Sequence, residues 1–116
     1  MPSDKNGKVI EHSETAIVAG CMRTLSEAGA LVQRNNSGLF LGANGRRVRA
    51  SMVGAADIIA CLGGKFIAVE CKARGGRITA AQARYGNAVT RAGGVYLIVR
   101  SPEQLAGLLA AQKSAE

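Results

Sequence analysis

The sequence predicts an α/β domain in which helices cover the faces of a central mixed β-sheet. Apolar residues recur at helical spacing near the start of the chain, and short apolar runs separated by glycine turns fill its middle. Two segments with helix-capping signals then bracket one more apolar run. The predicted order is about αββββαβα, with the division of the middle strands left open. A length of 116 residues fits one domain.

The first helix is predicted to begin at Ser13, a favourable N-cap, and to end at Gly29. Its buried face is marked by apolar residues at steps of three and four positions, which are Ile17, Val18, Cys21, Met22 and Leu25. Residues 1–11 are polar, and we expect them to form a flexible N-terminus. Residues 12–116 are then expected to form the single domain.

Turn-forming residues divide the middle of the chain into short strands. Residues 30–34 are predicted to form a strand that ends at the turn residues 35–38. Residues 39–41 and 47–52 are predicted to pair around Asn44-Gly45, a dipeptide that suits a tight hairpin turn. These segments supply the first strands of the domain.

A second antiparallel hairpin is predicted for residues 58–62 and 65–73, which flank Gly63-Gly64. A two-residue loop permits one register, in which residue 62 pairs with residue 65. Continued along the strands, that register places Asp57 opposite Glu70. Opposed residues of an antiparallel ladder have Cβ atoms about 4.5 to 5.5 Å apart on one face. The hairpin therefore predicts two neighbouring carboxylates.

Capping signals define the C-terminal part of the chain. Thr79 and Gln82 have the spacing of a capping box that opens a helix to about residue 92. Residues 95–99 read as a fully apolar strand. A last helix, to about residue 112, is opened by an N-cap, an N1 proline and a capping-box glutamine in Ser101-Pro102-Glu103-Gln104.

The charge of the chain favours a polyanionic partner. Its 15 Lys and Arg exceed its 8 Asp and Glu, which gives a net charge of +7. The field around such a protein attracts nucleic acid. Between Gly29 and Pro102 the only acids are Asp57 and Glu70. Two acids in so basic a segment require an explanation.

Several other classes of protein are not expected. The first dozen residues contain no apolar region of a secretory signal, so we expect a cytoplasmic protein. The longest apolar run, residues 52–62, is far shorter than the roughly 20 residues that span a bilayer. No Walker A motif is present, and no nucleotide cofactor is expected. Reduced, buried thiols are predicted for the cysteines, which lack CxxC spacing: Cys21, Cys61 and Cys71.

Lys72 joins the predicted pair of carboxylates, because residues two apart on a strand point to the same face. Like charges that oppose each other in a sheet destabilise it unless a cation compensates them. Lys72 alone could do so as a structural ion pair with Glu70. A divalent cation such as Mg²⁺ could also do so, and it would keep waters, one of which could attack a phosphorus atom.

Asp57 and the triplet Glu70-Cys71-Lys72 resemble the D…(D/E)-x-K signature of the PD-(D/E)XK nucleases. A longer succession of segments is similar to the VRR-NUC (virus-type replication-repair nuclease) family, from about Glu14 to Leu109. These segments are Gly54-Ala55-Ala56-Asp57-Ile58-Ile59, Phe66-Ile67-Ala68-Val69-Glu70-Cys71-Lys72-Ala73, Gly76-Arg77-Ile78-Thr79-Ala80-Ala81-Gln82 and Gly93-Gly94-Val95-Tyr96. The resemblance implies a restriction-endonuclease-like core.

The resemblance also implies a catalytic centre with Mg²⁺ or Mn²⁺. Asp57, Glu70 and the backbone carbonyl of Cys71 would ligate the metal, and Lys72 would serve the nucleophilic water. Glu14 matches an additional acid of the family on the first helix.

At three positions the sequence departs from the implied centre or allows a second interpretation. Glu11 lies one helical turn before Glu14 and is its rival. Gln82 matches a family glutamine beside the active site, although the capping box accounts for Gln82 equally well. Ala56 replaces the proline that often precedes the motif aspartate, which removes a backbone restraint and no ligand.

The expected activity is metal-dependent hydrolysis of DNA phosphodiester bonds. Stand-alone VRR-NUC proteins of phages and bacteria resemble this chain in being small. That likeness implies a DNA-repair homodimer that cuts branched DNA such as Holliday junctions. A structure-indifferent nuclease or nickase, or a non-catalytic DNA-binding module, stays open as an alternative. Phosphate contacts are expected from basic residues around the acidic cluster, which are Arg46, Arg47, Arg49, Arg74, Arg77 and Arg84.

Overall fold

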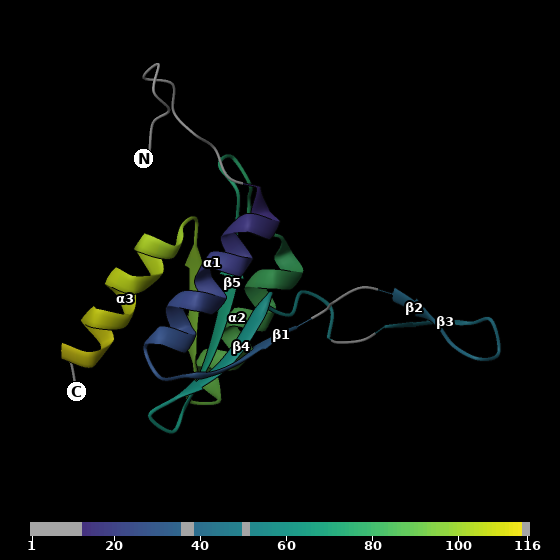
Figure 1. Ribbon diagram of the computed structural model, residues 1–116. Coiled ribbons are helices and arrows are strands. Elements are labelled where there is room, and N and C mark those ends of the chain that lie inside the picture. Colours follow the sequence, from purple (N-terminus) through teal and green to yellow (C-terminus); the bar gives the residue numbers. More distant parts are fainter. Residues whose placement is uncertain (1–12, 36–38, 50–51, 115–116) are drawn as a thin grey trace, which may run out of the picture.

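The structure is a computed structural model that describes residues 13–35, 39–49 and 52–114 (Figure 1). Its elements are α1 (Glu14–Glu27), β1 (Leu31–Arg34), β2 (Leu39–Leu41), β3 (Arg47–Arg49), β4 (Ile58–Leu62), β5 (Lys65–Cys71), α2 (Ala80–Arg91), β6 (Val95–Val99) and α3 (Pro102–Ser114). The predicted flexible N-terminus, and with it Glu11, lies outside the described residues.

The main sheet has four strands in the order β1-β4-β5-β6. β1 pairs with β4 and β4 with β5 in antiparallel fashion, whereas β5 and β6 are parallel. The prediction of a mixed sheet is therefore confirmed. α2 forms the crossover between the two parallel strands, which a hairpin cannot join. The helices within the described ranges are all too short or too polar to pass through a lipid bilayer.

Helices cover both faces of the main sheet, as predicted. Val69 on β5 belongs to a core that includes Leu25 of α1 and Leu105 of α3. The neighbouring Ala68 packs against Val89 of α2 instead. Successive residues of a strand point to opposite faces, so α1 and α3 lie on one face and α2 on the other (Figure 1).

β2 and β3 form a separate two-stranded sheet, which projects away from the main sheet (Figure 1). Phe40 pairs with Val48 across this ribbon. The predicted pairing around Asn44-Gly45 is thus confirmed, but β3 ends at Arg49. Residues 50–51 of the longer predicted strand lie outside the described residues, and Met52, its last residue, is not in a strand. Five strands precede α2 in the described residues, and each lies within one of the five predicted ranges, so the division that the predicted order left open is into five strands.

The first helix and the register of the second hairpin follow the sequence prediction, although β5 ends at Cys71 and not at Ala73. Ser13 caps α1 by accepting a hydrogen bond from the amide of Ala16 at 3.2 Å. Gly63 and Gly64, with φ of 59° and 78°, form the two-residue turn, so that residue 62 pairs with residue 65. The last pair of the ladder joins Ile58 and Val69. The next position places Asp57 opposite Glu70, which is the predicted register.

The prediction of three buried thiols is wrong for Cys61. Cys21 and Cys71 are buried, but Cys61 on β4 is exposed, and all three thiols are free. Cys61 pairs with Leu31 on one side and Phe66 on the other, so these side chains share one face of the sheet. All three are exposed because α2 packs farther along that face. Sequence alone does not indicate how much of a face a helix covers.

Gly54 permits a close contact between the segment before β4 and the first turn of α2. It has a φ of 78°, and a Cβ there would collide with the carbonyl group of Ala81 and lie 2.7 Å from the amide nitrogen of Gln82. We expect Gly54→Ala to lower the free energy of unfolding by about 2 kcal/mol or more, because backbone has to move. Urea unfolding measures this change. Gly29→Ala is the control, since Gly29 also has a positive φ but has no atom within 4 Å of its Cβ position. Equal losses in the two variants would contradict the close contact.

Candidate active site

Three carboxylates from separate elements meet at one end of the main sheet. Glu14 lies in the first turn of α1, Asp57 directly precedes β4, and Glu70 lies on β5. One oxygen atom from each lies within 4.8 Å of the other two. Such a set of hard oxygen donors is what Mg²⁺ and Mn²⁺ prefer. The structure therefore brings together all three acids that the sequence singled out on the described residues.

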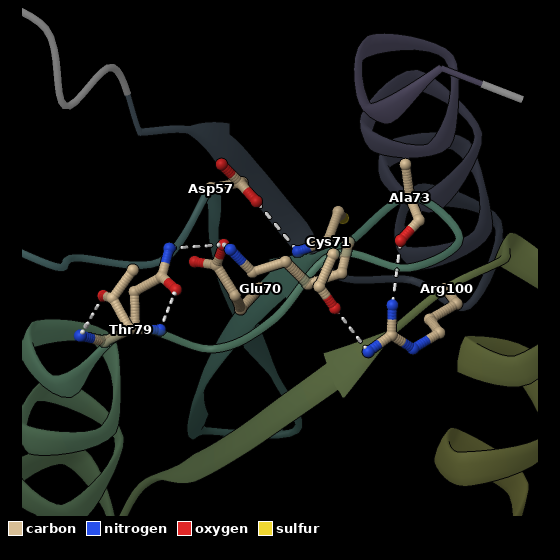
Figure 2. Close-up of polar contacts among 9 residues, drawn as sticks. Asp57, Glu70, Cys71, Ala73, Thr79 and Arg100 are labelled. Carbon is tan, nitrogen blue, oxygen red and sulfur yellow. Dashed lines mark hydrogen bonds and ion pairs between the residues drawn. The ribbon is translucent and has the colours of Figure 1, made fainter.

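Asp57 is held from both sides by hydrogen bonds. Its Oδ2 accepts a hydrogen bond from the amide of Cys71 at 2.8 Å (Figure 2). Its backbone carbonyl accepts one from the amide of Asn35 at 2.8 Å. The side-chain Nδ2 of Asn35 donates to the carbonyl of Ala56 at 3.0 Å. Asn35 thus restrains the carbonyl groups of both Ala56 and Asp57. Ala56 is the position at which the sequence resemblance led us to expect a proline. Sequence reasoning read Asn35 only as a turn residue and missed this role.

Glu70 is a buried carboxylate, with 2% of its surface exposed. Its Oε2 accepts a hydrogen bond from Gln82 and lies 3.7 Å from Nζ of Lys72. Its Oε1 is buried and has no hydrogen-bond partner among the described residues. Burial, followed by the negative charge of Asp57, raises the pKa of Glu70 to about 8, although Lys72 counteracts the rise. A cation beside Oε1 would stabilise the ionised carboxylate and so lower its pKa.

Lys72 continues the pairing of β5 with β6 by donating its backbone N–H to the carbonyl of Val99 at 2.9 Å. Its side chain is 10% exposed and forms the ion pair with Glu70. The structural ion pair weighed from the sequence is therefore present. It offsets one negative charge of a cluster that contains three carboxylates, so the pair alone does not neutralise the cluster.

Gln82 joins two roles that the sequence left as alternatives. Its Oε1 accepts a hydrogen bond from the amide of Thr79 at 2.9 Å, which completes the capping box of α2. Its Nε2 donates to Oε2 of Glu70 at 3.1 Å (Figure 2). Gln82 makes both contacts because the oxygen of its amide accepts hydrogen bonds and the nitrogen donates them. The start of α2 is thereby connected to the buried carboxylate.

The remaining predicted residues fall into three groups. The amide of Cys71 donates to Asp57, while the predicted metal contact of its carbonyl stays a prediction. Arg74 and Arg77 are exposed on the loop after Lys72, and Arg84 is exposed on α2. Three more arginines lie on or next to β3, in the ribbon that projects from the main sheet (Figure 1), and their expected phosphate contacts stay a prediction: Arg46, Arg47 and Arg49. Nothing in the spacing of these residues indicates that the ribbon lies apart.

No protein-family model matches the sequence, and no curated protein is similar to it. A solved structure described as a "VRR_NUC domain" is similar, however, with 22% sequence identity and a TM-score of 0.61. The match covers 84% of this chain and 94% of that one. The chain has the fold of a VRR-NUC domain. The fold class implied by the sequence resemblance is thus confirmed. In this VRR-NUC fold, Asp57, Glu70 and Lys72 lie together at one end of the main sheet.

Proposed function

We propose that this protein is a nuclease that hydrolyses DNA phosphodiester bonds with Mg²⁺ or Mn²⁺. The observation that carries the proposal is the buried Oε1 of Glu70, which has no partner among the described residues and lies in a cluster with two more carboxylates. A divalent cation satisfies such an oxygen and offsets the neighbouring charges. The VRR-NUC fold supports a nuclease rather than another metal-dependent activity.

In the proposed mechanism, Asp57, Glu70, Glu14 and the carbonyl of Cys71 would hold the metal. When bound, the metal would polarise the phosphate and acidify a water molecule. The Cys71 amide orients Asp57 through Oδ2, and Gln82 orients Glu70 through Oε2. These bonds keep the carboxylates in place as the substrate binds.

Lys72 supplies the positive charge beside the reacting atoms in this mechanism. Its Nζ lies 3.7 Å from Oε2 of Glu70 and is mostly buried. An ammonium group there can donate a hydrogen bond to the attacking water, or to the phosphate oxygens as their negative charge increases in the transition state. The ion pair with Glu70 holds the ammonium group beside the carboxylates that would bind the metal.

DNA is the proposed substrate because the basic charge extends around the site. Arg74 and Arg77 follow the catalytic lysine, and Arg84 lies on the helix that carries Gln82. The projecting β2-β3 ribbon, with its own arginines, would lie along the DNA as an arm. Contacts of this kind are made with phosphates, so the binding would depend on salt and little on sequence.

We further propose that the protein acts as a homodimer on branched DNA such as Holliday junctions. The sequence resemblance to small stand-alone VRR-NUC proteins supports this substrate. Two active sites related by a two-fold axis can cut opposed strands of a two-fold symmetric junction. The free thiols of Cys21, Cys61 and Cys71 fit a reducing compartment, and we place the activity in the cytoplasm.

Cleavage of labelled DNA by the purified protein tests the proposal. We expect cutting of a four-way junction with Mg²⁺ or Mn²⁺ and none with EDTA, because the carboxylates need the metal to act on a phosphate. A flap and a linear duplex of the same sequence serve as controls for substrate choice. Equal cutting of all three would contradict junction selectivity and support a structure-indifferent nuclease. Binding without cutting in either metal would contradict the enzyme and support a DNA-binding module.

A further inference from the structure

An exposed arginine bridges the loop that follows the proposed catalytic lysine. Nη1 of Arg100 donates to the carbonyl of Ala73, and Nη2 donates to the carbonyl of Gly76, each at 2.8 Å (Figure 2). The two acceptors lie more than twenty residues before Arg100 in the sequence. The side chain thus connects the end of β6 to the segment between β5 and α2.

Arg100 is itself fixed by the elements around it. The preceding residue, Val99, accepts a backbone hydrogen bond from Lys72, so β6 holds it beside β5. The backbone N–H of Arg100 donates to Oε1 of Gln104 at 2.7 Å, and the amide of Gln104 donates to Oγ of Ser101 at 3.0 Å. Gln104 was expected to accept a hydrogen bond from the backbone N–H of Ser101 in a capping box. It accepts one from the backbone N–H of Arg100 instead. This hydrogen bond connects the backbone of Arg100 to the start of α3.

The bridged loop lies beside the stem of Lys72. The amide of Gly76 donates to the carbonyl of Ala73 at 2.9 Å, and Gly75 has a φ of 82°, as in a type II turn. A Cβ on Gly76 would lie 3.5 Å from Cδ of Lys72 and 3.6 Å from its Cβ. The turn thus lies beside the aliphatic part of the lysine, close enough that a side chain at position 76 would contact it. The same loop continues into the capping box that aims Gln82 at Glu70.

We propose that Arg100 is a positioning residue of the candidate active site. It holds the turn of residues 73–76 against the stem of Lys72 and sets the start of α2, from which Gln82 reaches Glu70. This inference rests on the proposed function. The planar guanidinium presents two donors in a fixed fork that reaches both carbonyls, whereas the ammonium of a lysine is a single point. The role therefore requires arginine and is not met by positive charge alone.

Two variants and a control of the full chain test this role. Arg100→Ala removes both donors, Arg100→Lys keeps the charge without the fork, and Arg23→Ala removes an exposed charge on α1 as the control. Hydrogen exchange of residues 73–82, measured in EDTA without DNA, is the first readout. We expect exchange about tenfold faster or more in both Arg100 variants and no change in the control, because two charge-assisted hydrogen bonds are lost. If residues 73–82 of the Arg100→Lys variant exchange at the wild-type rate, the proposal is overturned.

Cleavage at saturating enzyme is the second readout. We expect the rate to fall about 10- to 100-fold in both Arg100 variants, while DNA affinity in Ca²⁺ stays within about threefold for Arg100→Lys. Rescue of the rate by lysine, or weaker DNA binding with an unchanged saturated rate, would assign Arg100 to DNA contact instead and overturn positioning. Absence of cleavage by the wild type would count against the proposed function, and the exchange readout then decides on Arg100 by itself. Should Arg100→Ala not fold, Arg100→Lys carries both readouts.

Discussion

Replacing Glu70 with glutamine is expected to abolish cleavage and, at the same time, to stabilise the metal-free protein above about pH 7. The neutral amide of the Glu70→Gln variant cannot supply the negative charge that the metal needs, so cleavage should fall by more than about 100-fold. Metal-free wild type, however, must bury a carboxylate next to Asp57 when it ionises, and the amide avoids this cost. We expect a gain of a few kcal/mol in the free energy of unfolding at about pH 8.5.

Opposite changes in activity and stability separate this effect from misfolding. Cleavage of a labelled junction in Mg²⁺ and urea unfolding in EDTA measure the two quantities. Lys72→Ala is the companion variant, since it should lower the rate by about 10² to 10³ and leave Mn²⁺ binding in place. Wild-type cleavage by Glu70→Gln would remove Glu70 from the catalytic centre. Equal loss of Mn²⁺ binding in both variants would contradict their separate roles.

Metal affinity is expected to depend steeply on pH, because the pKa of Glu70 is raised to about 8 by burial and by Asp57. Only the ionised carboxylate binds the metal, so each ion that binds below pH 8 must displace a proton. The affinity for Mn²⁺ should therefore increase about tenfold for each pH unit up to pH 8 and then level off. Calorimetry in buffers of different ionisation enthalpy would detect about one proton released per ion near pH 6.5. A pH-independent affinity across pH 6 to 8 would contradict the raised pKa.

The stability of the metal-free protein should change with pH in the opposite sense. Between the usual pKa of Glu, 4.5, and about 8, the folded protein keeps a proton that the unfolded chain has lost. The folded state is thus favoured at low pH, and this contribution is lost as the pH rises through 8. Urea unfolding in EDTA would show the decrease in the free energy of unfolding with rising pH. Glu70→Gln is the control, since this variant should not show the decrease. Saturating Mg²⁺ should also reverse it, since bound metal favours the ionised form.

Interactions close in the sequence were predictable. The two glycines at 63–64 allow one register of the β4-β5 hairpin, and that register placed Asp57 opposite Glu70 and brought Lys72 to the same cluster. The capping box of Gln82 was equally local. Each of these features depends on backbone geometry over a few residues, which residue types constrain directly.

Residue types and their spacing were enough to predict the elements, the hairpin register and the grouping of Asp57, Glu70 and Lys72. Three contacts emerged only from the packed fold: Glu14 reaches the carboxylates of Asp57 and Glu70, Asn35 restrains Asp57, and Arg100 bridges the loop after Lys72. The exposure of Cys61 and the projection of the β2-β3 ribbon away from the main sheet also follow from the packed fold. The physical reason is that these contacts join segments whose separation along the chain carries no geometric constraint, so packing of whole helices and strands sets them.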